Sequence, residues 1–295
     1  MTGCVNRDGR RFLRGLGAGI MIVGCAVGAF SEQVRFRLAE PSVIEGHLKS
    51  FSTKNSEREA LIRKWLVESG CKDPNLSEET PQRKLPPNVI CVLPGETQEV
   101  IVVGAHTDHV DTFRDGVVDN WTGASLLPSL LYSLSGQSRH HTFVFVGFTA
   151  KEKGLVGSGY YAEHLTPEQR TQIEAMVNMD SLGLSPTKVW ATHADKALLD
   201  ALALVASASG LPIAAVNVDR VGTADSESFA RYQIPRITLH SITEETWPIL
   251  HSSRDQLAAV KMNDYYDSYH LIAEYLAYLD EVLGKPASNP RKTAK

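Results

Sequence analysis

Short apolar runs rich in β-branched residues alternate with helical patterns along most of this chain. Runs typical of strands lie at residues 88–93, 99–105, 142–149, 175–180, 188–191 and 236–240, and helical patterns lie at about 57–69, 120–135, 155–164, 195–209 and 263–283. This alternation predicts an α/β fold, a three-layer sandwich with a central mixed, mostly parallel sheet flanked by helices. Pro128 should kink or interrupt the helix at 120–135. Ligands bind beyond the carboxyl ends of strands in such sheets, so functional residues are expected at that edge.

The composition is that of an ordinary globular protein and excludes several classes. Of 295 residues, 43% are hydrophobic, which is enough for a sizeable core. A total of 30 Lys and Arg against 34 Asp and Glu gives a net charge of −4 without basic clusters, which argues against nucleic acid as a partner. Four cysteines are too few for a disulfide scaffold. Cys71 and Cys91 lie in the predicted domain and either pair, in an oxidising compartment, or remain buried thiols.

The N-terminus differs from the rest of the chain. Arginines between residues 7 and 14 precede a charge-free stretch at 15–31, which predicts an export signal and is too short and glycine-rich for a stable transmembrane helix. The sequence Ile-Val-Gly-Cys ending at Cys25 resembles a bacterial lipobox, so lipidated Cys25 could attach the chain to a membrane. The alternatives are cleavage near Ala29 or an uncleaved anchor. We therefore expect an exported protein, periplasmic, membrane-anchored or secreted, with a signal at 1–30, a linker at 31–40, one domain at 41–284 and a flexible tail at 285–295.

Metal-competent side chains follow several of the predicted strands. They are His106 and Asp108 after the second run, Asp119 before a helix, Glu152 after the third run, Asp180 after the fourth, and His251 with Asp255 before the final helix. A single His or Asp at a strand end is usually a hydrogen-bonding or capping group, but the fold gathers these at one edge. Two imidazoles and three carboxylates form a mixed donor set suited to zinc, and a carboxylate can bridge two ions. Asp108 could accept the second N–H of the His106 imidazole.

The order and spacing of these residues resemble the M28 zinc aminopeptidases. The matching stretches are GAHTD, VVDNWTGAS, KEKGLVGS, VNMDSLG, DSESF and HSSRD, spread over residues 88–283. The resemblance implies a zinc-peptidase fold and a metal-dependent hydrolase that removes N-terminal residues from peptides with a metal-activated water. It implies that Asp119 bridges two zinc ions, that His106 and Asp180 complete one site, and that Glu152 and His251 complete the other. The oligomeric state is not predicted.

One position departs from the family pattern. Lys151 stands where the family has the glutamate that takes a proton from the attacking water, and a protonated ammonium cannot accept one. The charges of three carboxylates, one Zn²⁺ and one ammonium cancel, whereas two Zn²⁺, a hydroxide and the ammonium leave an excess positive charge. We therefore expect one tightly bound zinc and a weak or empty second position. The other possibility is a neutral Lys151 that acts as an unusual catalytic base, because burial and nearby cations both lower a lysine pKa.

Lys151 leaves two further functions open. One is a catalytically impaired pseudo-peptidase that binds metal and peptides without turnover. The other is a zinc acyltransferase similar to glutaminyl cyclases, although these also use the glutamate that Lys151 replaces. Glu244 and Glu245 were weighed as substitute bases, but charges in such a loop are more often solvated. A serine hydrolase is disfavoured because no Gly-x-Ser-x-Gly motif occurs.

Overall fold

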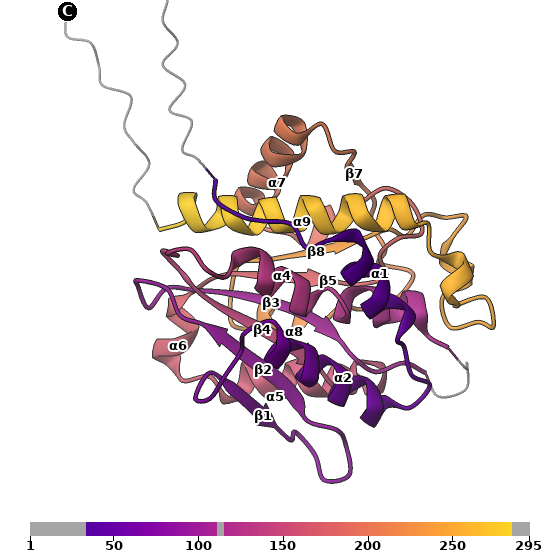
Figure 1. Ribbon diagram of the computed structural model, residues 1–295, viewed down its shortest axis with the longest axis horizontal. Helices are drawn as coiled ribbons and strands as arrows, with labels where there is room; N and C mark the ends of the chain where they lie inside the picture. Colours follow the sequence, from indigo (N-terminus) through magenta and orange to yellow (C-terminus); the bar gives the residue numbers. More distant parts are fainter. Residues whose placement is uncertain (1–33, 111–114, 285–295) are drawn as a thin grey trace, which may run out of the picture. The chain divides into compact units, whose positions relative to one another are not determined.

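The computed structural model describes residues 34–110 and 115–284 (Figure 1). The predicted signal, Cys25 and the C-terminal tail lie outside these ranges. Residues 34–40 have no regular secondary structure, yet they pack on the domain, because the Arg37 N–H donates to the Ser133 carbonyl (3.1 Å) and the Ala39 N–H to the Tyr269 hydroxyl (2.7 Å). Within the described ranges, no helix is both long enough and apolar enough to cross a membrane.

A mixed sheet forms the middle layer of the described chain. Its eight strands are ordered β1-β2-β4-β3-β5-β8-β6-β7. The strands are β1 (Leu76–Glu79), β2 (Asn88–Leu93), β3 (Val100–His106), β4 (Thr142–Phe148), β5 (Ile173–Met179), β6 (Lys188–Val189), β7 (Ala214–Ala215) and β8 (Arg236–His240). The central strands β4, β3, β5 and β8 are parallel, whereas β1, β2 and β6 pair antiparallel with their neighbours β2, β4 and β8. The predicted mixed, mostly parallel sheet is confirmed.

Helices cover both faces of this sheet. They are α1 (Pro41–Lys49), α2 (Asn55–Glu68), α3 (Thr122–Ala124), α4 (Leu127–Leu134), α5 (Val156–His164), α6 (Pro167–Gln172), α7 (Lys196–Ser209), α8 (Glu227–Ala230) and α9 (Met262–Val282). Alternation along β3 separates two cores: Ile101 and Val103 pack with α1, α2, α4, α7 and α9, whereas Val102 packs with α5 and α8. Figure 1 shows α2, α4 and α9 in front of the sheet and α5 behind it. The predicted three-layer sandwich is therefore confirmed.

The helical pattern predicted at 120–135 is interrupted, as Pro128 requires. An irregular turn at Val117–Trp121 and the short α3 precede α4, which carries Pro128 in its first turn. A proline is tolerated there because the first N–H groups of a helix have no intrahelical acceptor. The short elements β1, β7, α6 and α8 were not predicted, because segments of two to six residues carry too little periodicity.

Cys71 and Cys91 form a disulfide, which resolves the alternative that the sequence left open. Their Cα atoms lie 6.1 Å apart, and the bond joins the turn after α2 to strand β2. Both residues are buried in the larger core. The bond therefore connects the helical layer directly to the sheet.

Candidate metal centre

The predicted site residues meet at the carboxyl edge of the central strands. His106 ends β3, Asp180 follows β5, and Glu152 follows β4. Asp119 lies in the turn before α3, and His251 lies in the loop between β8 and α9. These side chains form two groups of three whose ligand atoms lie within 4.8 Å of one another, His106–Asp119–Asp180 and Asp119–Glu152–His251. The sheet thus brings together all five residues proposed as ligands.

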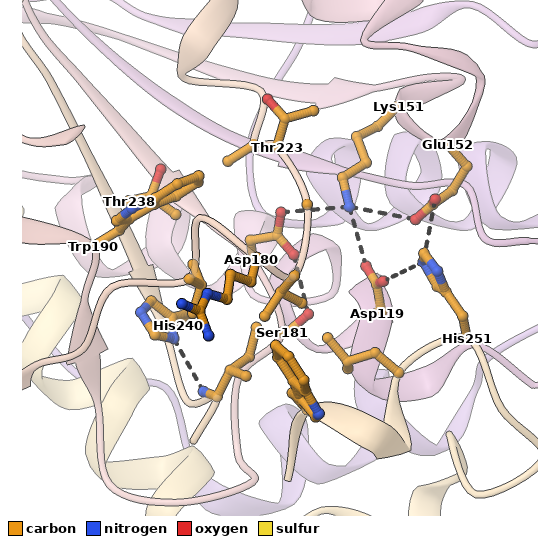
Figure 2. Close-up of a pocket in the computed structure, with 18 of the residues that line it drawn as sticks. Asp119, Lys151, Glu152, Asp180, Ser181, Trp190, Thr223, Thr238, His240 and His251 are labelled. Carbon is orange, nitrogen blue, oxygen red and sulfur yellow. Dashed lines mark hydrogen bonds and ion pairs between the residues drawn. The ribbon is translucent and has the colours of Figure 1, made fainter. Parts of the chain in front are cut away.

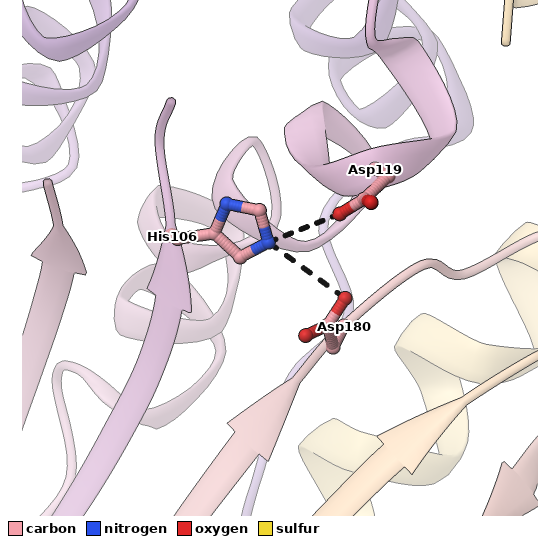
Figure 3. A group of neighbouring side chains, drawn as sticks. All are labelled: His106, Asp119 and Asp180. Atoms are coloured by element: carbon pink, nitrogen blue, oxygen red, sulfur yellow. Dashed lines mark ion pairs between the residues drawn. The ribbon is translucent and has the colours of Figure 1, made fainter. Parts of the chain in front are cut away.

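The first group is buried (Figure 3). His106 Nε2 lies 3.1 Å from Asp119 Oδ1 and 3.7 Å from Asp180 Oδ1. The other ring nitrogen, Nδ1, is 3.0 Å from the Asp108 carbonyl oxygen. A carbonyl only accepts, so Nδ1 carries a hydrogen and Nε2 is the ring nitrogen that faces the two carboxylates. Nε2 and Asp119 Oδ1 are buried without a hydrogen-bond partner, so a proton or a metal ion must lie between them.

The second group shares Asp119 and is more open. His251 Nε2 lies 3.0 Å from Asp119 Oδ2 and 3.3 Å from Glu152 Oε2. These two carboxylates raise the pKa of His251 to about 10, although its side chain is 48% exposed. Asp119 therefore offers one oxygen to each imidazole, which is the geometry of a bridging carboxylate. Two imidazoles and three carboxylates in this arrangement fit zinc.

Asp108 positions the turn that carries Glu152. Its carboxylate accepts the backbone N–H of Lys151 at Oδ1 (2.9 Å) and of Glu152 at Oδ2 (3.1 Å). This corrects the expected partnership with His106, because the Nδ1–H donates to the Asp108 carbonyl while the carboxylate oxygen stays 3.6 Å away. The carboxylate is already engaged by two main-chain donors.

Asp255 supports the turn that carries Asp119, the proposed bridging ligand. It accepts the backbone N–H groups of Val118 (2.5 Å) and Asp119 (3.2 Å). Burial and the charge of Asp119 raise the pKa of Asp255 to about 7. A neutral Asp255 would lose part of its acceptor strength, so its charge state bears on how firmly Asp119 is held.

Two further residues organise this turn and were not predicted. The Asn120 side chain donates to the Met179 carbonyl (2.9 Å) and accepts the Ser181 N–H (3.0 Å), which ties the turn to the end of β5. Asn120 directly follows Asp119, and this Asp-Asn pair was the available signal. Arg58, fully buried in α2, donates to the Gly116 carbonyl (3.1 Å). A single arginine in a helical pattern gave no such signal.

Lys151 lies against all three carboxylate ligands (Figure 2). Its Nζ is 3.4 Å from Glu152 Oε1, 3.5 Å from Asp119 Oδ1 and 3.7 Å from Asp180 Oδ2. Burial alone would lower the pKa of Lys151, but these charges outweigh it and raise the pKa well above its usual value. The ammonium is therefore charged at neutral pH when the site holds no metal. The alternative of a neutral Lys151 that accepts a proton in the zinc-loaded site stays a prediction.

The other acidic residues near the site do not replace the missing base. Glu244 and Glu245 are exposed, and neither lines the pocket beside the metal groups. Asp225 is fully buried, its two carboxylate oxygens have no hydrogen-bond partner, and burial raises its pKa to about 6. The neighbouring Ser226 has its hydroxyl 2.8 Å from that of Thr238. The described carboxylates that line the pocket are therefore the three ligands themselves.

A pocket of about 450 Å³ opens beside the metal groups (Figure 2). Asp119, Glu152, Asp180 and His251 line one end of it together with Lys151. The remaining wall comes from Trp190, the segment at 218–224 and residues at 238–250. A ligand in this pocket can therefore contact the metal groups at one end and a separate side-chain surface at the other.

Comparison with known proteins identifies the family. Residues 88–276 match peptidase family M28, and this is more than half of the chain. The chain belongs to peptidase family M28. An aminopeptidase of Pseudomonas aeruginosa strain UCBPP-PA14 is 34% identical over 89 residues, 30% of this chain and 16% of that protein. Aminopeptidase YwaD of Bacillus subtilis is 32% identical over 87 residues, 30% of this chain and 19% of that protein. The matched segments thus span less than a fifth of these relatives.

Solved structures show the same M28 fold at low identity. The LapA aminopeptidase of Legionella pneumophila has a TM-score of 0.70 at 21% identity, covering 81% of this chain and 70% of that one. A zinc aminopeptidase from Bacillus subtilis has a TM-score of 0.59 at 21% identity, covering 65% and 49%. A glutaminyl cyclase from an Acidobacteriales bacterium has a TM-score of 0.67 at 16% identity, covering 83% and 97%. Similarity at this level supports the fold, and the M28 assignment rests on the sequence match.

Proposed function

We propose that this M28 protein is a zinc-dependent aminopeptidase that removes N-terminal residues from peptides. The observation that carries the proposal is Asp119, which presents Oδ1 to His106 (3.1 Å) and Oδ2 to His251 (3.0 Å). Aminopeptidase relatives and the adjoining pocket agree with this activity.

The chain's own groups suit this reaction. Zinc, when bound, supplies a Lewis acid that activates water and polarises the scissile carbonyl. The carboxylates of Asp180 and Glu152 at the pocket end attract the α-ammonium of a peptide, and the Lys151 ammonium can donate hydrogen bonds to a carbonyl oxygen. The oxygens left to accept a proton from water are Glu152 Oε1 and Asp180 Oδ2, and both contact Lys151. We therefore expect slower turnover than a glutamate at this position would give.

We assign the tightly bound ion to the first group. His106, Asp119 and Asp180 are buried, the imidazole tautomer is set by the Asp108 carbonyl, and the orphaned atoms Nε2 and Oδ1 belong to this group. The second group depends on His251, a half-exposed loop residue. Lys151 supplies one positive charge to the same carboxylates, so a single Zn²⁺ balances the site. A second Zn²⁺ would add two positive charges to a site whose charges already balance.

The test is aminopeptidase activity on a panel of aminoacyl p-nitroanilides, with metal content measured on the same purified sample. Turnover that a chelator abolishes and zinc restores would support the peptidase. Bound zinc without turnover on any substrate would support the metal-binding pseudo-peptidase instead. Cyclisation of a peptide with N-terminal glutamine, assayed in parallel, tests the cyclase alternative. A His106→Ala variant is the control, because it should lose the metal and any metal-dependent activity together.

We also propose that the chain is exported by residues 1–30, with lipidation at Cys25 as one outcome. The Cys71–Cys91 disulfide supports export, because such bonds persist in oxidising compartments. Cell fractionation of the full chain and of a Cys25→Ser variant tests both parts. Loss of membrane association in the variant alone would support lipidation. Recovery of both proteins from the cytoplasm, with reduced cysteines, would refute export.

A further inference from the structure

The far wall of the pocket is apolar toward a ligand. Trp190, Val218, Ala224 and Ile242 form a small buried cluster, and Val221 and Leu250 pack against it. All six residues line the pocket beyond the metal groups. A side chain that enters this part of the pocket therefore meets hydrocarbon and indole surface.

Two polar residues in the same wall, His240 and Thr238, already have hydrogen-bond partners. The His240 Nε2–H donates to the Val216 carbonyl (2.9 Å), and its Nδ1 accepts the Ile242 N–H (3.0 Å). Burial lowers the pKa of His240 to about 4, so the ring is neutral at physiological pH. The Thr238 hydroxyl is paired with that of Ser226 (2.8 Å). The Trp190 Nε1–H is buried in this wall without a hydrogen-bond partner.

Arg220 brings a positive charge to this wall. It lines the pocket, and the described part of the chain gives its guanidinium no hydrogen bond and no ion pair. The neighbouring Asp219 carboxylate is taken by His193 Nε2 at 2.9 Å. Lys151, the other pocket lysine or arginine among the described residues, is neutralised by three carboxylates. Arg220 is thus the pocket cation that remains without an acidic partner.

We infer that the pocket prefers a peptide whose N-terminal side chain carries a carboxylate on a short aliphatic stem, glutamate before aspartate. The stem would cover the apolar wall and the carboxylate would pair with the Arg220 guanidinium, whose planar fork matches a carboxylate. Glutamate is favoured because its extra methylene covers more apolar surface. The substrate carboxylate is not repelled from the pocket, because Lys151 and one Zn²⁺ balance the negative charges of the carboxylates proposed as ligands. This inference rests on the proposed aminopeptidase function.

The first test compares kcat/KM for glutamyl and leucyl p-nitroanilide in the zinc-loaded full chain. These substrates lack a peptide C-terminal carboxylate, so a role of Arg220 in binding that group would not affect them. We expect the glutamyl-to-leucyl ratio of kcat/KM to exceed one and to fall by about tenfold in Arg220→Ala. This is the lower end of the effect of losing a hydrogen bond to a charged group, because Arg220 is exposed. Arg220→Lys should retain part of the ratio. Arg231→Ala, an exposed arginine outside the pocket, is the matched control and should leave the ratio unchanged.

A binding measurement separates this inference from the proposed function. L-Glutamate and L-leucine, the two products, are titrated calorimetrically into the wild type and into Arg220→Ala. Tighter binding of glutamate that is lost in the variant supports the inference even if no p-nitroanilide is hydrolysed, in which case the aminopeptidase proposal alone fails. Equal or tighter binding of leucine, with an unchanged ratio in Arg220→Ala, overturns the inference while leaving the aminopeptidase intact. A fall in rate on dipeptides only would assign Arg220 to the C-terminal carboxylate and overturn it as well.

Discussion

Replacing Lys151 should change the number of zinc ions that the protein retains. Its ammonium lies 3.4–3.7 Å from oxygens of all three carboxylate ligands, so any second cation bound by Asp119 and Glu152 must lie close to it. At roughly 4 Å and an effective dielectric near 20, each pair of unit charges repels by about 4 kcal/mol, and a dication meets about twice that. Even if relaxation and water leave only about 2 kcal/mol, the second ion would bind roughly 30-fold more weakly.

The assay is zinc content after exhaustive dialysis, with the affinity of each ion measured by competition with a chelator. We expect one retained zinc in the wild type and two in Lys151→Glu, which reverses the charge. Lys151→Met is the matched control, because it removes the charge and keeps the chain length without adding a proton acceptor. Lys151→Met should gain the second ion without the gain in turnover expected for Lys151→Glu. Two tightly held ions in the wild type, or a single ion in both variants, would refute the electrostatic reasoning.

Three further predictions concern the supports of the site and the fold. Asp255→Asn should weaken zinc binding by about 10- to 100-fold, measured by chelator competition. The reason is that an amide has one acceptor oxygen for the two backbone N–H groups that bond to Asp255. Unchanged affinity would mean that the turn at Val118 and Asp119 keeps its conformation without Asp255. Cys71→Ser with Cys91→Ser should lower the free energy of unfolding by about 3 kcal/mol in urea, as expected for a bond across 20 residues, and a reductant should have the same effect on the wild type only. His141, buried between Asp280 and Glu174, has its pKa raised by these carboxylates against the effect of burial. Its stabilising charge is fully present below the ordinary pKa of 6.5 and is lost as pH rises through the raised value, so unfolding free energies measured from pH 6 to 9 should fall more in the wild type than in His141→Gln.

Three of the five proposed ligands could be placed at one edge from the sequence because they sit at strand ends, whereas the full set was implied by the resemblance to M28 aminopeptidases. His106, Asp180 and Glu152 follow long apolar runs whose periodicity is unambiguous, and parallel strands bring such ends to one edge. The same logic gave the three-layer sandwich. It could not give the partners of individual atoms, because a spacing of two residues leaves a carboxylate and a carbonyl of Asp108 equally near an imidazole. It also could not decide the Cys71–Cys91 bond, which depends on how the turn after α2 packs on β2.

The charge state of Lys151 could not be predicted from the sequence either. From the sequence, burial and nearby metal ions argued for a lowered pKa, and nothing in the residue order placed three carboxylate oxygens within 3.7 Å of Nζ. In the metal-free site these carboxylates raise the pKa of Lys151 instead. The role proposed for Arg220 could not be predicted from the sequence either. It depends on the adjacent Asp219 pairing with His193 instead of with Arg220.

The Asp108 carboxylate accepts hydrogen bonds from the backbone N–H groups of Lys151 and Glu152, and this affects which residues of such a site can change in evolution. Backbone N–H groups are the same whatever side chain follows them, so the ligand Glu152 keeps its place whichever residue stands at 151. The side chain at position 151 can therefore be exchanged without loss of the backbone hydrogen bonds that position Glu152. A single codon change can weaken, restore or redirect the reaction while the metal cradle, the pocket and the fold stay as they are.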